Sequence, residues 1–272
     1  MNLDEFFALF EQELRSNDEL TGYHRVINSE KLYEFRKAYI KQRLQYVLDQ
    51  VEKQESLIWD VGCGFGTTSI LLALNGHKVV GTTLEYYYDG ISKRMDFWKK
   101  YGDLSKLNFA YENLFTQEHA PERFDYIVAQ DTLHHLEPFR DAVTIFYKTL
   151  KPGGKLIAVE ENGDNIINNV KNFMRRGTKR VTTIYDEKLD QEIQFGDENT
   201  RNLAKWKKEF SVAPFDFDEG SIEYVRYYLP AAYKKYDSEE ILEKERKLWR
   251  KSSLKRKYFF FGLNFTASKP RR

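Results

Sequence analysis

The sequence predicts an α/β fold with a mostly parallel, doubly wound sheet. Short apolar runs alternate with stretches of helical periodicity; the runs are 57–61, 77–84, 107–111, 124–129 and 155–160. Strands that alternate with helices in this way form a parallel sheet covered on both faces. A glycine-rich loop at 62–66 also stands where the first strand meets the first helix, which is the context of a ligand-binding loop.

The composition narrows the class of protein. The chain has 272 residues, enough for one or two domains, and its 15% aromatic content argues against disorder. A net charge of +1, from 43 basic and 42 acidic residues, excludes a globally basic nucleic-acid binder. The single cysteine, Cys63, excludes an internal disulfide and a cysteine zinc cluster. The N-terminus lacks a secretory signal, and no apolar run is long enough to span a membrane, so we expect a cytoplasmic protein.

The remaining segments lack the strand–helix alternation. Residues 1–50 show helical spacing of apolar residues, with a plausible helix cap at 28–30. Residues 163–220 are rich in Asn, Asp, Lys and Arg, and are interpreted as an insertion with some helix. Runs at 222–229 and 258–267 predict strands, and 234–251 predicts a charged helix. We expect four parts: an N-terminal helical lid (1–50), an α/β core (51–162), an insertion that caps the substrate side (163–220), and final strands and helix that complete the sheet (221–272).

The glycine loop and an acid after the second strand indicate the ligand. Glycines permit positive φ and let a ligand approach the backbone. The spacing G-x-G-x-G in 62–66 differs from the G-x-G-x-x-G of dinucleotide enzymes. Asp60 precedes the loop; its carboxylate would repel a pyrophosphate and attract an ammonium or sulfonium. Glu85 follows Gly66 by 19 positions and can accept hydrogen bonds from ribose hydroxyls. The pattern favours a cationic nucleoside; a plain glycine turn and an exposed strand end are the alternatives.

Five stretches carry a family resemblance: LIWDVGCGFG, KVVGTTLE, LNFAYENLF, FDYIVAQDTLHHLEP and LKPGGKLIAVEE. In this order they resemble the class I S-adenosylmethionine-dependent methyltransferases of small-molecule type, over roughly residues 55–160. The resemblance implies a Rossmann-like, seven-stranded sheet with an antiparallel last strand. It implies S-adenosylmethionine as methyl donor and S-adenosylhomocysteine as product. The acceptor would be an oxygen, nitrogen or carbon nucleophile of a small organic molecule.

The resemblance also assigns cofactor-binding residues, all within the core 51–162. At the adenine position Asn stands where the family commonly has Asp, and an amide oxygen can still accept from the adenine amino group. The expected contacts are Asp60, Gly62, Cys63, Gly64 and Gly66 around the methionine part and ribose, Glu85 at the ribose hydroxyls, Asn113 and Leu114 at the adenine, and Gln130 beside the methionine arm.

Catalytic candidates follow the fourth and fifth strands. A histidine at His134 or His135 can take a proton from an attacking oxygen or nitrogen, although either ring can instead pack on the following helix. Glu160 and Glu161 end the fifth strand, and Glu161 is the third candidate base; both could also be solvated residues before a turn. The sequence shows no metal-ligating constellation.

Alternative functions stay open at this point. Nucleic-acid methyltransferases that act on amino groups carry an Asn/Asp-Pro-Pro-Tyr/Phe run after the fourth strand; this chain has Gln-Asp-Thr-Leu at 130–133. The stretch 244–257 holds eight basic residues and one acid, and is interpreted as a solvated helix face, with a phosphate-binding surface as the alternative. An RNA or protein methyltransferase, or a non-catalytic cofactor-binding scaffold, are the competing hypotheses. The oligomeric state is not predicted.

Overall fold

The structure, a computed structural model, describes residues 1–84 and 86–271 and divides into two compact units. Unit 1 comprises Met1–Tyr111 and Tyr228–Lys244, and unit 2 comprises Glu112–Tyr227 and Glu245–Arg272. The four parts expected from the sequence remain a prediction, because compactness alone does not identify a lid or a cap. No helix in the described ranges is long and apolar enough to cross a membrane.

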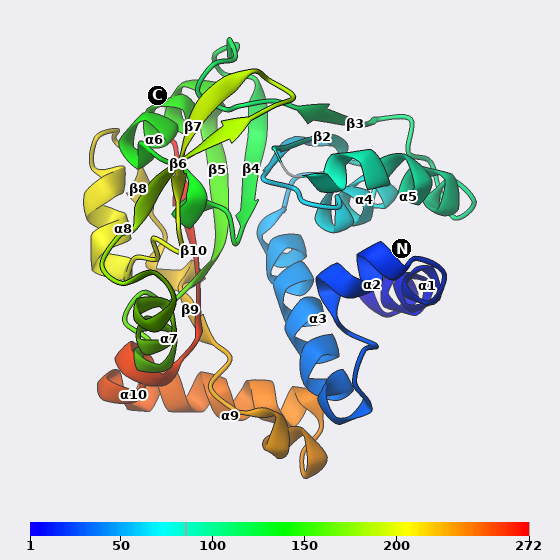
Figure 1. The fold of residues 1–272 in the computed structure, drawn as a ribbon, viewed down its shortest axis with the longest axis vertical. Coiled ribbons are helices and arrows are strands. Elements are labelled where there is room, and N and C mark those ends of the chain that lie inside the picture. The colour runs from blue at the N-terminus through cyan, green and yellow to red at the C-terminus, as the bar shows by residue number, and fades with distance from the viewer. Residues whose placement is uncertain (85, 272) are drawn as a thin grey trace. The chain divides into compact units, whose positions relative to one another are not determined.

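Unit 1 contains three parallel strands in the order β3-β2-β1, of which β2 and β3 are labelled in Figure 1. They are β1 (Leu57–Val61), β2 (Lys78–Thr83) and β3 (Leu107–Tyr111). Their register pairs Asp60 with Gly81 on the neighbouring strand. Helix α4 (Thr67–Leu74) begins directly after the glycine loop, and α5 (Ile91–Trp98) precedes β3. The strand–helix–strand order predicted from the apolar periodicity is therefore confirmed in this unit.

Three helices begin unit 1: α1 (Leu3–Ser16), α2 (Asp18–His24) and α3 (Tyr33–Gln50). The side chains of Asn2 and Glu5 cap the first turn of α1 reciprocally, which satisfies backbone donors that the helix leaves free. Phe6 of α1 is buried and stacks on Trp98 of α5, with ring centroids 4.6 Å apart. The apolar face of α1 therefore packs against the helix that leads into β3.

Unit 2 contains two parallel strands, β4 (Phe124–Gln130) and β5 (Leu150–Glu161), joined by helix α6 (Phe139–Thr149). Strand β10 (Gly262–Ser268) is antiparallel to β5, as the resemblance implied for the last strand. Two short strands, β8 (Asp216–Phe217) and β9 (Glu223–Val225), pair with β10. The described residues thus give five strands here and three in unit 1, besides a separate hairpin. That is one more than the seven implied, because two short strands, β8 and β9, both pair with β10.

Aromatic side chains fill the core of unit 2. Trp206 and Phe210 lie on α8 (Leu203–Phe210) and are both fully buried. The Trp206 ring meets Phe139 of α6 at 4.9 Å, and Phe210 meets Phe265 of β10 at 6.0 Å. Helix α8 of the predicted insertion is therefore an integral part of the core of its unit.

Three elements differ from the prediction. The run 222–229 forms a strand only over β9, because Arg226 takes a left-handed backbone conformation (φ 63°) and Pro230 starts a 3₁₀ helix. The run 258–267 starts its strand only at Gly262, since helix α10 (Ser253–Phe259) begins at a Ser252 side-chain cap. The insertion contains helix α7 (Ile166–Arg176) and an unpredicted hairpin, β6 (Val181–Asp186) with β7 (Gln191–Gly196) (Figure 1).

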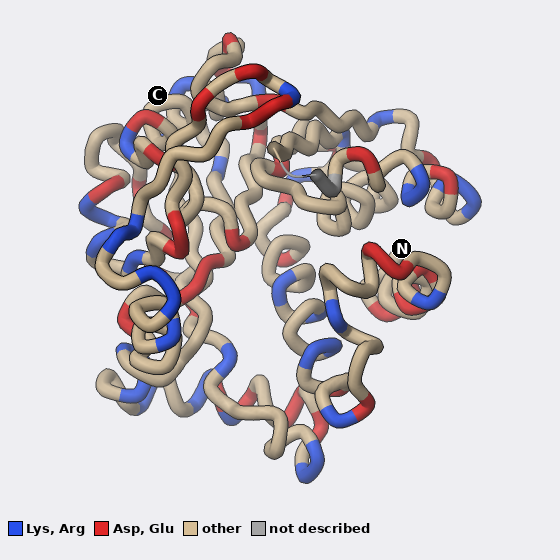
Figure 2. Tube along the Cα trace, viewed as in Figure 1, with Lys and Arg blue, Asp and Glu red and all other residues tan. Residues whose placement is uncertain are grey.

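Charges are spread over the chain. Figure 2 shows Lys and Arg interspersed with Asp and Glu, in agreement with the net charge of +1. Helix α9 (Ser238–Lys251), which begins in unit 1 and ends in unit 2, carries the first part of the basic stretch 244–257. Within that stretch Lys255 lies over the Tyr227 ring at 5.7 Å, and Arg256 lies over Tyr224 at the same distance. These cations contact local aromatic rings, and the phosphate-binding alternative stays a prediction.

Candidate active site

The glycine loop between β1 and α4 has the backbone that its composition predicts. Gly62, Gly64 and Gly66 have φ values of 67°, 53° and 74°, in the region that side chains disfavour. The N–H of Cys63 donates to the Thr82 carbonyl (3.0 Å), and the N–H of Gly66 donates to the Cys63 carbonyl (2.8 Å). The loop is therefore tied to β2 and folded back on itself. Burial raises the pKa of the Cys63 thiol, in line with a structural part in the loop.

Two of these glycines have different surroundings. A Cβ on Gly66 would lie 2.6 Å from the Phe109 ring, so close packing alone demands glycine there. A Cβ on Gly64 would lie 2.8 Å from the Tyr23 hydroxyl, the far end of a flexible and partly exposed side chain. Gly64 is consequently the loop position whose neighbour can yield to a ligand.

Asp60 is buried at the end of β1 and is held by one serine. The Ser69 hydroxyl donates to its Oδ2 at 2.6 Å. Burial raises the pKa of Asp60 to about 7, against the smaller lowering effect of the Ser69 hydrogen bonds. Near neutral pH the carboxyl is therefore poised between its two protonation states. A cationic group placed beside it would favour the charged form.

A buried ion pair between Arg94 and Glu13 holds the glycine loop in place. Arg94 of α5 forms two hydrogen bonds with the Glu13 carboxylate (2.8 and 2.7 Å) and donates to the Phe65 carbonyl at 2.6 Å. It also donates to the Thr67 hydroxyl at 2.8 Å, at the start of α4. Trp98 donates its indole N–H to the same Glu13 carboxylate. This network could not be predicted from the sequence, because Glu13 and Arg94 are 81 residues apart and each resembles an ordinary helix-surface charge.

The other predicted cofactor residues stay predictions. Glu85 falls outside the described residues. Asn113, Leu114 and Gln130 belong to unit 2 and are described there by themselves. The Asn113 side-chain oxygen accepts from the Phe115 N–H at 3.0 Å and forms a local turn. Leu114 is buried, and Gln130 is the last residue of β4.

Glu160 is the centre of a buried polar cluster in unit 2. Its Oε1 accepts from the backbone N–H groups of Thr132 (3.0 Å) and Leu133 (2.7 Å). Its Oε2 lies 2.5 Å from Nδ1 of His134, and since this carboxylate oxygen accepts, Nδ1 carries the proton. Burial alone would lower the pKa of His134, but the Glu160 charge and hydrogen bond outweigh it and raise the pKa to about 9. Glu160 thus orients His134 and favours its charged form.

His135 is held by the hairpin. Its Nδ1 lies 2.7 Å from the Gly196 carbonyl, which can only accept, so Nδ1 carries the proton. The ring stacks on Phe195, with centroids 4.5 Å apart and planes inclined by 13°. Burial and the neighbouring His134 charge lower the pKa of His135. The ring is therefore neutral at pH 7, with its lone pair on Nε2.

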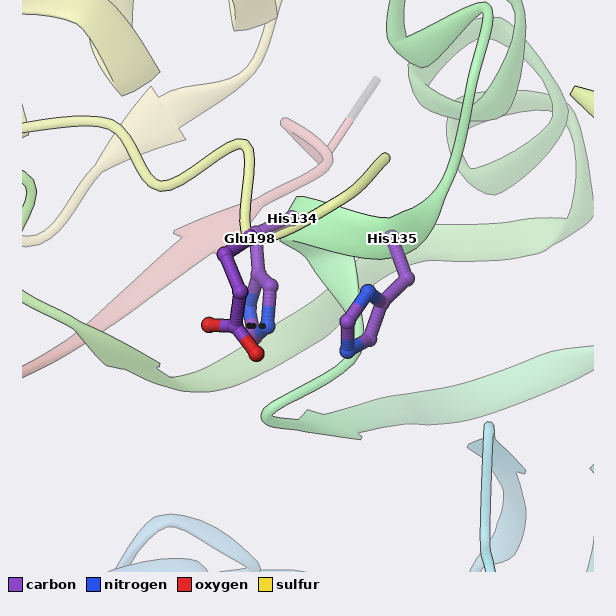
Figure 3. Close-up of side chains that lie close together, drawn as sticks. All are labelled: His134, His135 and Glu198. Atoms are coloured by element: carbon purple, nitrogen blue, oxygen red, sulfur yellow. Dashed lines mark ion pairs between the residues drawn. The ribbon is translucent and has the colours of Figure 1, made fainter. Parts of the chain in front are cut away.

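Glu198, two residues after β7, joins the two histidines. Its Oε2 lies 3.9 Å from Nε2 of His134. Figure 3 shows the carboxylate of Glu198 and the His134 ring side by side, with the His135 ring next to them. One nitrogen of each ring and one Glu198 oxygen all lie within 4.8 Å of one another. Sequence reasoning missed Glu198, because it is 63 residues from His135 in a segment without a recognisable motif.

Glu161, the third catalytic candidate, lies beside the same cluster. Asn168 of α7 donates to its Oε2 at 3.0 Å. Burial raises the pKa of Glu161; the charges of Asp131 and Glu198 act in the same direction, and Arg226 opposes them. The structure therefore brings His134, His135 and Glu161 together at the carboxyl ends of β4 and β5, in unit 2. Their catalytic roles remain proposals.

Comparisons of the sequence with known proteins find methyltransferases. Residues 59–156 match the family described as a methyltransferase domain. A ubiquinone biosynthesis O-methyltransferase of Coxiella burnetii is 29% identical over 118 residues, which are 42% of this chain and 47% of the relative. The chain thus spans about half the length of this curated relative.

Solved structures share the fold at low sequence identity. One is phosphoethanolamine N-methyltransferase 2 of Haemonchus contortus, solved with S-adenosyl-L-methionine; its TM-score is 0.56 and its sequence identity 16%. The superposition covers 85% of this chain and 52% of that protein's chain. The [4+2]-cyclase SpnF has a TM-score of 0.57 at 16% identity, covering 88% of this chain and 83% of its own. The second protein shows that the fold is also found in a protein named for another reaction.

The strand order within each unit and these likenesses define a Rossmann-like α/β fold of the methyltransferase type, which confirms the predicted fold class. Residues 59–156 match the methyltransferase-domain model, and this is the class of domain that the resemblance indicated from the sequence.

Proposed function

We propose that this protein transfers a methyl group from S-adenosylmethionine to a hydroxyl oxygen of a small organic molecule. The observation that carries the proposal is the cluster at the ends of β4 and β5, where His135 is neutral with its lone pair on Nε2. A hydroxyl nucleophile arrives protonated and needs such a proton acceptor. The O-methyltransferase named among the relatives favours oxygen over nitrogen or carbon.

The cofactor would bind at the glycine loop of unit 1. The three positive-φ glycines at 62, 64 and 66 place no side chain between the backbone and a ligand, and Asp60 supplies a carboxylate for a cationic donor. S-adenosylmethionine carries both a sulfonium and an ammonium. The buried Arg94–Glu13 pair fixes the loop before the ligand arrives, so that little ordering is needed on binding.

Two groups are candidates for the base. His135 is neutral, and burial raises the pKa of Glu161 toward the range in which a carboxylate takes protons effectively. His134 is a weaker candidate, because its pairing with Glu160 keeps it protonated near neutral pH. The remaining catalysis would come from alignment of nucleophile, methyl carbon and sulfur.

A binding experiment tests the cofactor assignment. Isothermal titration should show that S-adenosylmethionine and S-adenosylhomocysteine bind wild type and that Gly64→Ala loses binding. Gly76→Ala is the matched control, since Gly76 also has positive φ (91°), belongs to the same unit and has open space around a Cβ. Absence of binding to wild type, or equal loss in both variants, would contradict the proposal.

An activity experiment tests the acceptor. Labelled methyl transfer to a panel of small hydroxylated compounds should exceed transfer to RNA and protein fractions. Replacing the true base, in His135→Gln or Glu161→Gln, should lower kcat by about 10²–10⁴ while cofactor affinity is retained. If both variants stay within about threefold of wild type, neither group is the base and the hydroxyl assignment fails.

A further inference from the structure

We propose that His134, His135 and Glu198 form a binding site for a divalent transition-metal ion. The three side chains converge in unit 2, with one ligand atom of each within 4.8 Å of the others. Two of these atoms, Nε2 of His134 and Oε2 of Glu198, are 3.9 Å apart. The proposal rests on this geometry and does not depend on methyl transfer being the reaction.

Both rings are held in the way that metal-binding histidines are held. Nδ1 of His134 donates to the Glu160 carboxylate, and Nδ1 of His135 donates to the Gly196 carbonyl. In metal sites the ring nitrogen opposite the ligand atom almost always donates to a carboxylate or a backbone carbonyl. Here two successive residues show that arrangement, one with each kind of acceptor. Nε2 is left as the ligand atom on both.

The supports of the rings are themselves fixed. Both oxygens of Glu160 are engaged, by two backbone N–H groups and by His134. His135 is stacked on Phe195 of the hairpin, and the two histidine ring centroids are 4.1 Å apart. If the histidines served packing alone, a single histidine with its hydrogen bonds made would be enough. Packing would not explain why ring nitrogens of two adjacent histidines lie close to the same acid.

Glu198 is the adjustable ligand. About a third of its side-chain surface is exposed, whereas His134 is buried. In a tetrahedral site with metal–ligand distances of about 2.0–2.2 Å, the ligand atoms lie roughly 3.4 Å apart. The Glu198 oxygen must therefore move about half an ångström closer to Nε2 of His134, which a rotation of the partly exposed carboxylate can supply.

The donor set selects the kind of metal. Two imidazole nitrogens and a carboxylate suit Zn²⁺, Fe²⁺ or Co²⁺, whereas Mg²⁺ and Ca²⁺ prefer oxygen ligands alone. The ion would take the place of any proton on Nε2 of His134, because metals bind the deprotonated ring. Three protein ligands leave a coordination position open, as in catalytic zinc sites.

The site has a consequence for the proposed reaction. A hydroxyl oxygen bound at the open position would lose its proton more readily, since a bound cation stabilises the anion. His135 would then be a ligand, and Glu161 beside the cluster would be left to take the proton. This consequence rests on the proposed function; the metal site does not.

Metal titration of the purified chain tests the site. The protein is first stripped of metal with a chelator and dialysed. Co²⁺ is then added, and its binding is monitored by the visible d–d absorption of the bound ion. Zn²⁺ is added last and should displace the Co²⁺. We expect one ion per chain and no displacement by Mg²⁺. Glu198→Gln and His135→Gln should each weaken Co²⁺ binding by at least about tenfold, and Glu160→Gln, which removes a support, by about 10–100-fold.

Matched controls separate this site from adventitious binding. Glu192→Gln changes an exposed acid of the same hairpin, and His119→Gln changes a histidine of the same unit outside the cluster; both should bind like wild type. Circular dichroism checks that each variant is folded. Wild type without Co²⁺ binding, or folded Glu198→Gln and His135→Gln with unchanged affinity, overturns the proposal. Titration of metal-free wild type with S-adenosylhomocysteine is scored separately, so failure of the metal site and failure of the proposed function are distinguishable.

Discussion

Asp60 should make the stability of the protein depend on pH in a way that one substitution removes. Its carboxyl is buried beside the Ser69 hydroxyl, and its pKa is raised from the ordinary 3.8 to about 7. The folded state therefore holds this proton more tightly than the unfolded state does. The free energy of unfolding must fall as pH rises from about 4 to about 7, because above that pH a buried charge has to be kept. Asp60→Asn keeps the shape and the acceptor for Ser69 but cannot ionise.

The size of the effect follows from the shift. A rise of about three pKa units corresponds to about 4 kcal/mol, which is fully lost above the folded-state pKa of Asp60. Between pH 5 and pH 8, wild type should lose about 2–3 kcal/mol of stability relative to Asp60→Asn. All other titrating groups are common to both proteins, so their contributions cancel in the difference.

Urea denaturation at pH 5, 6, 7 and 8 measures this difference directly. Ser69→Ala is the informative control: the Ser69 hydroxyl lowers the pKa of Asp60, so its removal should steepen the loss of stability with pH. Wild type and Asp60→Asn could instead lose stability in parallel across this range. That result would refute the reasoning, because it would mean that the pKa of Asp60 does not differ between the folded and unfolded states.

Three further changes test the packing. Glu13→Gln and Arg94→Met should each lower the free energy of unfolding by about 3–5 kcal/mol, because each leaves a buried charge unpaired. In urea denaturation the double variant should lose clearly less than the sum of the two, and additive losses would contradict this. Trp206→Ala should lower the free energy of unfolding by about 3–5 kcal/mol through the cavity it leaves. Trp206→Phe should lower it less, because the indole N–H has no acceptor among the described residues and its loss breaks no hydrogen bond. Equal melting temperatures for the two variants would contradict this expectation. Gly81→Ala should cost about 1–3 kcal/mol, since its Cβ would lie 2.6 Å from the Phe109 ring, and adding Phe109→Ala should relieve that clash; no rescue means that the strain lies elsewhere.

The sequence was informative wherever local patterning decides the structure. Strands β1 and β3 match their predicted ranges, because each is a compact apolar run bounded by turn residues or polar segments. The prediction failed for the hairpin of β6 and β7, because β6 is mostly exposed and its sequence Val-Thr-Thr-Ile-Tyr-Asp does not alternate between apolar and polar residues. It also failed at 258–261, where aromatic residues resemble a strand, but helix α10, which starts at the Ser252 cap, extends to Phe259.

The candidate site divides in the same way. The positive-φ backbone at 62–66 is a local property of glycine, and it was predictable. His134 and His135 were recognisable by their position after β4, but their states depend on Glu160 and on Gly196, which are 26 and 61 residues away. The pKa of a side chain depends on what the fold places beside it, and no spacing in the sequence shows that.

The contact at Gly196 also bears on how this protein can diverge. A Cβ at this position would lie 2.1 Å from the His134 carbonyl oxygen, so the hairpin meets the histidine turn backbone against backbone. Strand β6 of the hairpin is mostly exposed. Descendants can therefore lengthen or recharge the hairpin tip while that one glycine stays fixed. Variation at the tip and the integrity of the histidine cluster are in this way separable targets for natural selection.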